Sequence, residues 1–100
     1  MKFLVVGLPK HQIPPEQLPG VIDGAIAWSE RYQGKLDAFG MFPGGGGFGI
    51  ADVSDETELN QMIIDMPFTW FSDVEVRPFV EGNAGLQQLK QAVEAMAAMA

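Results

Sequence analysis

The sequence has no cysteine, one histidine and only six lysine and arginine residues among its 100 positions. Without cysteine the chain has no disulfide, no thiolate metal ligand and no cysteine nucleophile, and a single histidine gives little basis for a metal site. The six basic residues stand against thirteen acidic ones, for a formal net charge of -7. Because phosphate contacts need clustered basic side chains, we expect neither nucleic acid nor a membrane surface as a partner.

The chain also lacks a long hydrophobic run. The apolar start from Met1 to Leu8 is too short for a signal peptide, and no stretch approaches the length of a transmembrane helix. We therefore expect a cytoplasmic protein. We expect residues 1–100 to form a single domain. A domain of this size buries only about two thirds of the surface that its unfolded chain exposes, so a second copy could supply further burial.

What is present is a regular alternation of strand and helix patterns. Strands are predicted at Lys2 to Leu8, about Lys35 to Phe42, about Phe48 to Val53, and Asp73 to Val80. The first helix is predicted from Pro14-Pro15 to near Gly34, the second from a cap at Ser54 or Asp55 to Pro67, and the last from a cap at Asn83. The glycine run from Gly44 to Gly47 predicts a flexible hairpin between the second and third strands.

The order strand, helix, strand, strand, helix, strand predicts a ferredoxin-like α+β fold, βαββαβ, with an added C-terminal helix. Two helices would cover one face of a four-stranded antiparallel sheet and leave the other face free. That free face would be apolar, because the first strand is apolar on both sides and the next two add Phe39, Met41, Phe48 and Ile50. We therefore expect a homodimer in which two sheets pack face to face, a dimeric α/β barrel.

Three aromatic side chains, Phe68, Trp70 and Phe71, crowd the connector between the second helix and the fourth strand. Loops normally run over the surface, where several large aromatic side chains in a row are unusual. The connector is therefore expected to pack beneath other elements or against a partner.

Two stretches resemble the muconolactone isomerase-like family of dimeric α/β barrels. They are Phe42-Pro43-Gly44 with Phe48 to Val53, and Met66 to Val76. The family has a strand that ends in Asp-Val, a helix that ends in Leu-Pro or Met-Pro, an aromatic connector, and an Asp-x-Glu-Val strand. In place of the charged groups that the family carries on its first helix and second strand, this chain has Val21 to Gly24, Asp37 and Gly40.

The resemblance implies a small cofactor-independent enzyme that moves a proton between two carbons of a lactone or related small cyclic substrate. It also implies a role in aromatic-compound catabolism. Such chemistry needs a general base beside an acidic carbon and a donor to the developing enolate oxygen. Trp70 in the aromatic connector is the residue that we expect to touch this small-molecule ligand.

Three side chains are candidates for the acid-base work. His11 is the only imidazole and follows the first strand, although a solvated loop histidine is the plainer alternative. Asp37 interrupts an apolar strand, so it is either an inward-facing base or an exposed residue near the strand start. Tyr32 lies on the buried stripe of the first helix, where its hydroxyl needs a partner and core packing is the alternative.

Four residues are candidates for substrate binding: Trp28, Phe39, Trp70 and Arg77. Arg77 could hold a substrate carboxylate through two parallel hydrogen bonds, or it could form an ion pair with Glu75 or across a dimer. The aromatic residues could wall an apolar pocket, or they could belong to the core or an interface.

Other functions remain open on the same scaffold, because one fold supports many activities. A non-catalytic small-molecule-binding or accessory dimer would keep the scaffold without its acid-base groups. A cofactor-free monooxygenase or a polyketide cyclase is a further alternative. The observation that distinguishes these functions is whether Asp37 and Tyr32 converge in one cavity.

Overall fold

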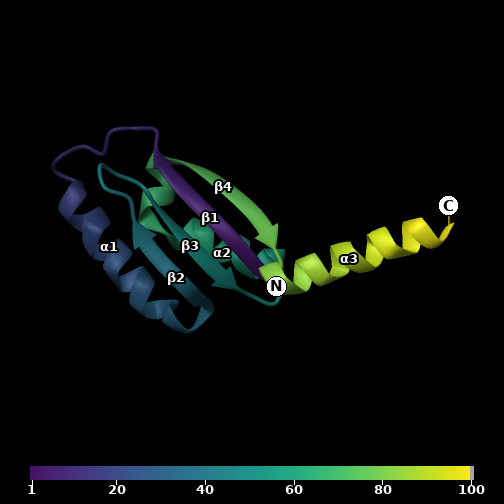
Figure 1. The fold of residues 1–100 in the computed structure, drawn as a ribbon. Helices are drawn as coiled ribbons and strands as arrows, with labels where there is room; N and C mark the ends of the chain where they lie inside the picture. The colour runs from purple at the N-terminus through teal and green to yellow at the C-terminus, as the bar shows by residue number, and fades with distance from the viewer. Residues whose placement is uncertain (100) are drawn as a thin grey trace.

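The computed structural model describes residues 1–99 as an open sheet with two helices on one side and a third helix that projects away (Figure 1). The strands are β1 (Lys2–Pro9), β2 (Leu36–Met41), β3 (Gly47–Asp52) and β4 (Ser72–Phe79). The α-helices are α1 (Leu18–Arg31), α2 (Glu56–Asp65) and α3 (Gly82–Met99), and two short 3₁₀ helices, η1 (Gln33–Lys35) and η2 (Pro67–Phe71), lead into β2 and β4. The predicted ferredoxin-like α+β fold with a C-terminal helix is confirmed.

The sheet has the strand order β2-β3-β1-β4, and every neighbouring pair is antiparallel. Successive residues of a strand point to opposite faces, so Phe3 and Val5 of β1 face the helices while Leu4 and Val6 face the other way. The register carries this alternation across the sheet, since Leu4 lies opposite Ile50 on one side and Arg77 on the other. The sheet therefore has one helix-covered face and one free face.

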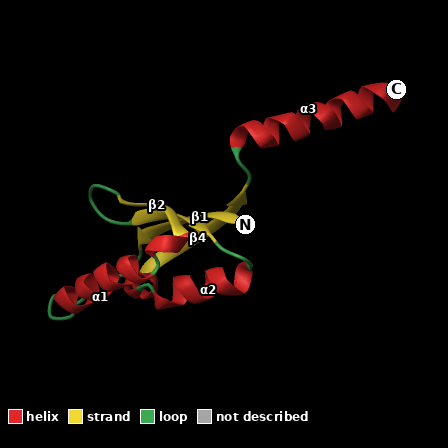
Figure 2. Ribbon diagram, turned by 90° about the horizontal axis from the view of Figure 1, so that it is seen from below, coloured by secondary structure: helices red, strands yellow, loops and turns green. Residues whose placement is uncertain are grey.

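Both α1 and α2 lie on the same side of the sheet (Figure 2). The hydrophobic core lies between these helices and the sheet. Its residues are all less than a tenth exposed: Phe3, Trp28, Ala51, Val53, Leu59 and Met62. Trp28 is the largest of these side chains, and its Nε1 donates a hydrogen bond of 2.9 Å to the carbonyl oxygen of Met62. This bond joins α1 to α2 directly.

The start of α2 is the cap that the sequence predicts. The Asp55 carboxylate accepts a hydrogen bond from the Glu58 backbone N–H at 2.9 Å, and the Glu58 carboxylate accepts one from Ser54 at 2.8 Å. Reciprocal bonds of this kind satisfy backbone donors that have no partner inside the helix.

The starts of the other two helices differ from the predictions. Helix α1 begins at Leu18 rather than at the proline pair, with Pro19 in its first turn, where no intrahelical donor is lost. Pro14 instead starts a turn closed by the hydrogen bond from the Gln17 backbone N–H to its carbonyl oxygen. Helix α3 is capped by Glu81 rather than Asn83. The Glu81 carboxylate accepts hydrogen bonds from the backbone of Ala84 and Asn83, and these bonds lower the pKa of Glu81.

The hairpin between β2 and β3 explains the glycine run. Gly44, Gly45 and Gly46 all have positive φ angles, between 83° and 120°, a region that side-chain-bearing residues rarely enter. A Cβ atom on Gly46 would lie 2.5 Å from the carbonyl oxygen of Gly7. Glycine therefore lets the hairpin pass close over the end of β1.

Helix α3 stands clear of the sheet and of the other helices in both views (Figures 1 and 2). The projection makes the described chain 65 Å long but only 25 Å by 22 Å across. Among residues 1–99, no helix is both long enough and apolar enough to span a bilayer.

Candidate functional site

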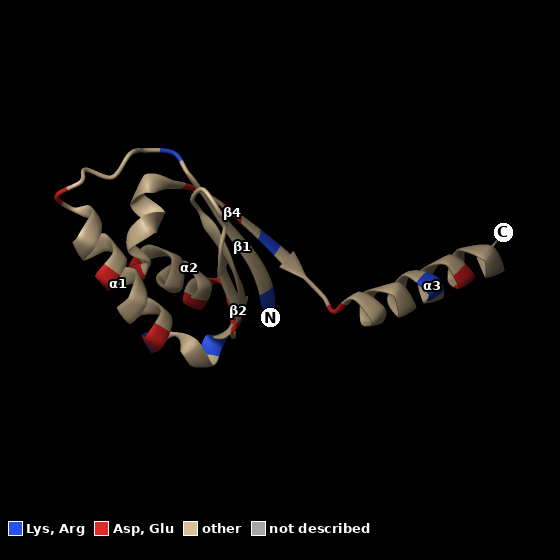
Figure 3. Ribbon diagram, turned by 60° about the vertical axis from the view of Figure 1, so that its left-hand side comes forward, with Lys and Arg blue, Asp and Glu red and all other residues tan. Residues whose placement is uncertain are grey.

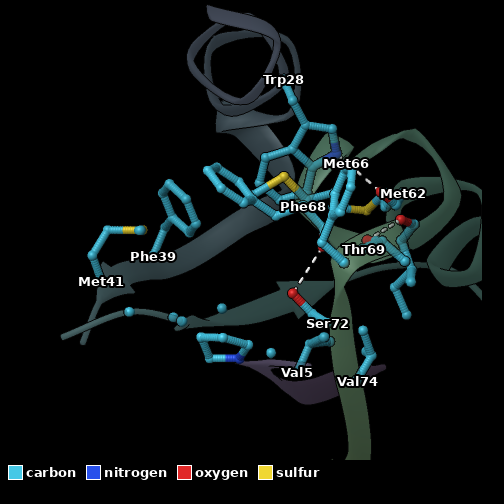
Figure 4. A pocket seen from close by; sticks show the side chains of 18 of the residues that line it. Val5, Trp28, Phe39, Met41, Met62, Met66, Phe68, Thr69, Ser72 and Val74 are labelled. Atoms are coloured by element: carbon cyan, nitrogen blue, oxygen red, sulfur yellow. Dashed lines mark hydrogen bonds between the residues drawn. The ribbon is translucent and has the colours of Figure 1, made fainter. Parts of the chain in front are cut away.

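A cavity of about 260 Å³ lies between the helix-covered face of the sheet and the elements packed on it (Figure 4). Val5, Phe39, Met41 and Val74 line it from the strands, and Trp28, Met62, Met66 and Phe68 line it from α1, α2 and the segment that follows. Its volume is near the lower end of the range for small-molecule sites, about 300–1,000 Å³. The cavity is therefore suited to a ligand with a single ring.

The lining of this cavity is almost entirely apolar. No Asp, Glu, Lys or Arg of the described chain borders it. Three side-chain donors in the lining are already used by backbone carbonyls: Trp28 bonds to Met62, Thr69 to Ile63 at 2.6 Å, and Ser72 to Phe68 at 2.8 Å. These donors stabilise the walls, and a ligand would find few free polar groups.

His11 is the one titratable side chain among the described lining residues. It lies in the loop after β1, and its backbone N–H donates a 3.0 Å hydrogen bond to the carbonyl oxygen of Phe71 in η2. Like Phe39 and Met41, it is both exposed and part of the lining. These three residues mark the side on which the cavity meets solvent.

The aromatic connector forms η2, and its aromatic side chains lie in two different environments. Phe68 and Phe71 line the cavity, whereas Trp70 is 67% exposed and lies outside it. A 3₁₀ helix has three residues per turn, so Phe68 and Phe71 share a side. Thr69 also lines the cavity, and Trp70 does not. The expectation that the connector packs beneath other elements holds for the two phenylalanines. Trp70 does not pack beneath its own chain and does not border this cavity, so for Trp70 only the alternative of a partner contact remains, as a prediction.

Asp37 lies outside the cavity and is exposed, so the inward-facing alternative is wrong. It sits where the β2–β3 register shifts between Leu36 and Ala38, and its carboxylate forms an ion pair with Lys2. Lys2 is also 3.7 Å from the carboxylate of Asp52. The hydrogen bond to Asp37 raises the pKa of Lys2. The irregularity in β2 turns Asp37 toward Lys2 at the start of β1.

Tyr32 also lies outside the cavity lining. Its hydroxyl donates a hydrogen bond of 2.5 Å to the Asp65 carboxylate, which accepts a second bond from Gln61. The hydrogen bond between Tyr32 and Asp65 raises the pKa of Tyr32. The same bond, together with the one from Gln61, lowers the pKa of Asp65. The Tyr32 ring packs against Trp28 with centroids 5.6 Å apart. Tyr32 therefore joins α1 to α2, and it does not converge with Asp37.

Arg77 lies on the free face of the sheet, opposite Leu4. Its Nε donates a hydrogen bond of 3.0 Å to the carboxylate of Glu75, two residues earlier in β4. The ion-pair alternative for Arg77 is the one that the structure contains. Of the seven candidate residues, the cavity brings together three: His11, Trp28 and Phe39.

The sequence analysis placed Phe39 and Met41 on the free face with Phe48 and Ile50, and this is wrong, because both line the cavity on the helix-covered face. It also missed Met66 and Ser72 as lining residues. The signal for Met41 was available, because it lies two residues after Phe39 and so must share its face of the strand. No comparable signal exists for Ser72, since its position depends on how η2 enters β4.

Comparison with solved structures identifies the architecture. One similar structure is muconolactone isomerase, with a TM-score of 0.71, 17% identity, and coverage of 81% of this chain and 90% of that one. The chain has the muconolactone isomerase fold. A second is 5-chloro-2-hydroxyhydroquinone dehydrochlorinase from Burkholderia phenoliruptrix AC1100 in complex with 2,5-dihydroxybenzoquinone, with a TM-score of 0.66, 20% identity, and coverage of 84% and 98%. No protein-family model matches the chain, and no curated protein does so either.

The resemblance to the muconolactone isomerase-like family is thus confirmed for the fold. At identities of 17% and 20% the likeness carries the architecture alone. The muconolactone isomerase structure leaves about a fifth of this chain unmatched, which is close to the length of α3, 18 residues.

The Tyr32–Asp65 bond predicts a stability effect that depends on pH. Tyr32→Phe should lower the melting temperature at pH 7 by about 2 to 5 °C, because it removes a hydrogen bond between α1 and α2. The bond needs an ionised Asp65 and a neutral Tyr32. The difference between the two proteins should therefore shrink as the pH falls through the lowered pKa of Asp65, and again as it rises through the raised pKa of Tyr32.

Thermal unfolding followed by circular dichroism across the pH range measures this difference. Asp65→Asn and the double variant complete a mutant cycle. A difference that stays constant with pH would show that Tyr32 acts through packing alone.

Proposed function

We propose that this chain is a small cofactor-independent enzyme that transfers a proton on a cyclic substrate held in the cavity, with His11 as the acid-base group. The supporting observation is that His11 is the one titratable side chain in an otherwise apolar lining. An imidazole changes its protonation near neutral pH and can act both as base and as acid. Two enzymes with this fold, an isomerase and a dehydrochlorinase, have names that refer to small cyclic compounds.

In this reaction the neutral imidazole of His11 takes a proton from a ring carbon beside a carbonyl group. The electron pair of the broken C–H bond moves into the ring as an enolate, and the imidazolium returns the proton to another carbon of the same ring. Proton and charge therefore balance without a cofactor. The exposed position of His11 allows its proton to exchange with water between turnovers.

The lining favours an uncharged ring over a carboxylate. A buried carboxylate without a partner is costly, and no Lys or Arg among residues 1–99 borders the cavity. Arg77, the candidate for holding such a group, is engaged with Glu75 on the opposite face of the sheet. We infer that the substrate is a lactone, quinone or phenol that lacks an ionised substituent inside the cavity.

A second candidate function is small-molecule binding without catalysis. It is supported by the hydroxyl groups of Thr69 and Ser72, which already donate to backbone carbonyls and so do not offer a ready donor to an enolate oxygen. The same lining is also suited to the electron-rich aromatic substrate of a cofactor-free monooxygenase or to a polyketide cyclase. Loss of proton transfer without loss of binding in a His11 variant distinguishes the enzyme from the binding protein.

We also propose that the protein forms a homodimer through the free face of the sheet. Leu4, Val6, Phe48 and Ile50 share this face by register, and Phe79 extends it along β4. The rings of Phe42 and Phe48 stack with centroids 5.8 Å apart, and Phe48 also covers Gly40. Glu75 and Arg77 lie on the same face in β4, where they pair with each other, so the apolar part of the face lies mainly over β1 and β3. An apolar sheet surface of this kind is usually buried against a second sheet.

Binding should depend on the charge of the ligand. The methyl ester of muconolactone should bind at least about tenfold more tightly than muconolactone itself, because the ester removes the carboxylate while keeping the ring. Trp28 reports on the cavity, and Trp70→Phe leaves it as the single tryptophan for a fluorescence titration. Equal or stronger binding of the carboxylate would contradict an uncharged substrate.

Proton transfer should depend on His11. The His11→Ala variant should catalyse the exchange of the ligand's ring hydrogen for deuterium in D2O at least about 100-fold more slowly than the wild type. Its affinity for the ligand should change by less than about threefold. Nuclear magnetic resonance of the muconolactone ester follows the exchange. Gln12→Ala, a change in the neighbouring residue outside the lining, is the matched control. No catalysed exchange by the wild type would favour the binding function.

Self-association should depend on the free face. Val6→Lys places a charge in the middle of that face and should weaken self-association at least about tenfold in sedimentation experiments. Thr57→Lys, which adds the same charge at an exposed position of α2, is the control. An unchanged association constant for Val6→Lys would rule out the sheet-to-sheet dimer.

A further inference from the structure

Helix α3 carries an apolar stripe that nothing in its own chain covers. Leu86, Leu89, Val93 and Met96 are between 55% and 71% exposed, and no residue of the helix is buried. In proteins, most of the stability of a helix comes from packing of its apolar face rather than from helix propensity. A persistent α3 therefore needs a surface on which this stripe packs.

The spacing of the stripe indicates what kind of surface that is. The four residues follow one another at intervals of three, four and three, which is the a and d spacing of a coiled-coil seam over less than two heptads. Helices that pack on a sheet or in a core usually show a wider apolar face. The seam is bordered by the small residues Gly85 and Ala92, which allow a second helix to approach closely. The partner surface is therefore another helix.

Charge favours a second α3 over other helices of this protein. The chain has a formal net charge of -7, yet α3 contributes one lysine and one glutamate, Lys90 and Glu94, which lie within 4.0 Å of each other. Figure 3 shows acidic residues, coloured red, along α1 and α2. The exposed apolar residues Ile22 and Ile26 of α1, for example, are near Asp23 and Glu30, and α3 has no surplus positive charge to match them.

We propose that α3 is a self-association helix that pairs with α3 of a second copy along the seam formed by Leu86, Leu89, Val93 and Met96. This contact is separate from the cavity and from the free face of the sheet, so it does not rest on the proposed function. A leucine at d and a valine at a favour two-stranded pairing.

The test compares two variants of the full chain that carry the same added charge, both made in the Val6→Lys protein so that the proposed sheet-face contact is already removed. Leu89→Glu with Val93→Glu places two carboxylates in the seam, whereas Gln88→Glu with Gln91→Glu places them on the outer side of the helix. We expect the seam variant to self-associate at least about 100-fold more weakly than the Val6→Lys parent in sedimentation experiments and to lose helical circular dichroism. The outer variant should keep the association and helicity of that parent.

A complementary seam variant separates pairing from simple loss of folding. Leu89→Lys with Val93→Lys should also fail to associate alone, but an equal mixture with the Glu seam variant should regain association and helicity. Opposite charges then meet whichever way the two helices run, because residue 89 faces either residue 89 or residue 93 of the second helix. Fluorescence of Trp28 checks that the sheet and its helices stay folded.

The proposal is overturned if the Glu seam variant associates as tightly as the Val6→Lys parent, or if mixing the two seam variants does not restore association. It is also overturned if the outer variant loses association to the same degree. A failure of the sheet-face dimer is visible separately, because Val6→Lys leaves the α3 seam intact.

Discussion

The side chain of Trp28 is the contact on which the rest of the structure depends. It is 8% exposed, and it ties α1 to the last turns of α2 through its bond to the Met62 carbonyl. Its ring also meets Phe39 of β2 edge-on, with centroids 5.6 Å apart. One indole therefore fixes two helices over one face of the sheet and walls the cavity. Replacing it would remove core packing and the cavity wall together.

One-sided covering of the sheet explains the remaining surfaces. Because both helices lie on the face that carries Phe3, the face that carries Leu4, Val6 and Ile50 is left without a cover from its own domain. Helix α3 leaves the end of β4 and does not return to that face. The chain therefore has two separate apolar surfaces, a sheet face and a helix seam, and each is suited to a second copy of the same protein.

The chemistry available in the cavity is limited because the polar groups around it are already engaged in other contacts. The donors of Trp28, Thr69 and Ser72 are all bound to backbone carbonyls, and the charged candidates Asp37 and Arg77 are paired elsewhere with Lys2 and Glu75. What remains is an apolar chamber with a single imidazole at its open side. That combination favours a small uncharged ring and a proton transfer that needs one base.

The sequence by itself determined the order of elements, the cap of α2, the glycine hairpin and the alternation that makes both faces of β1 apolar. These follow from local periodicity and backbone preference, which act over a few residues. Only the tertiary structure decided that Asp37 turns outward at a bulge, that Trp70 leaves the cavity while Phe68 and Phe71 enter it, and that Tyr32 binds Asp65. Each of these depends on the phase of a short irregular segment or on a contact between residues distant in the chain, and a one-residue shift there moves a side chain to the other face.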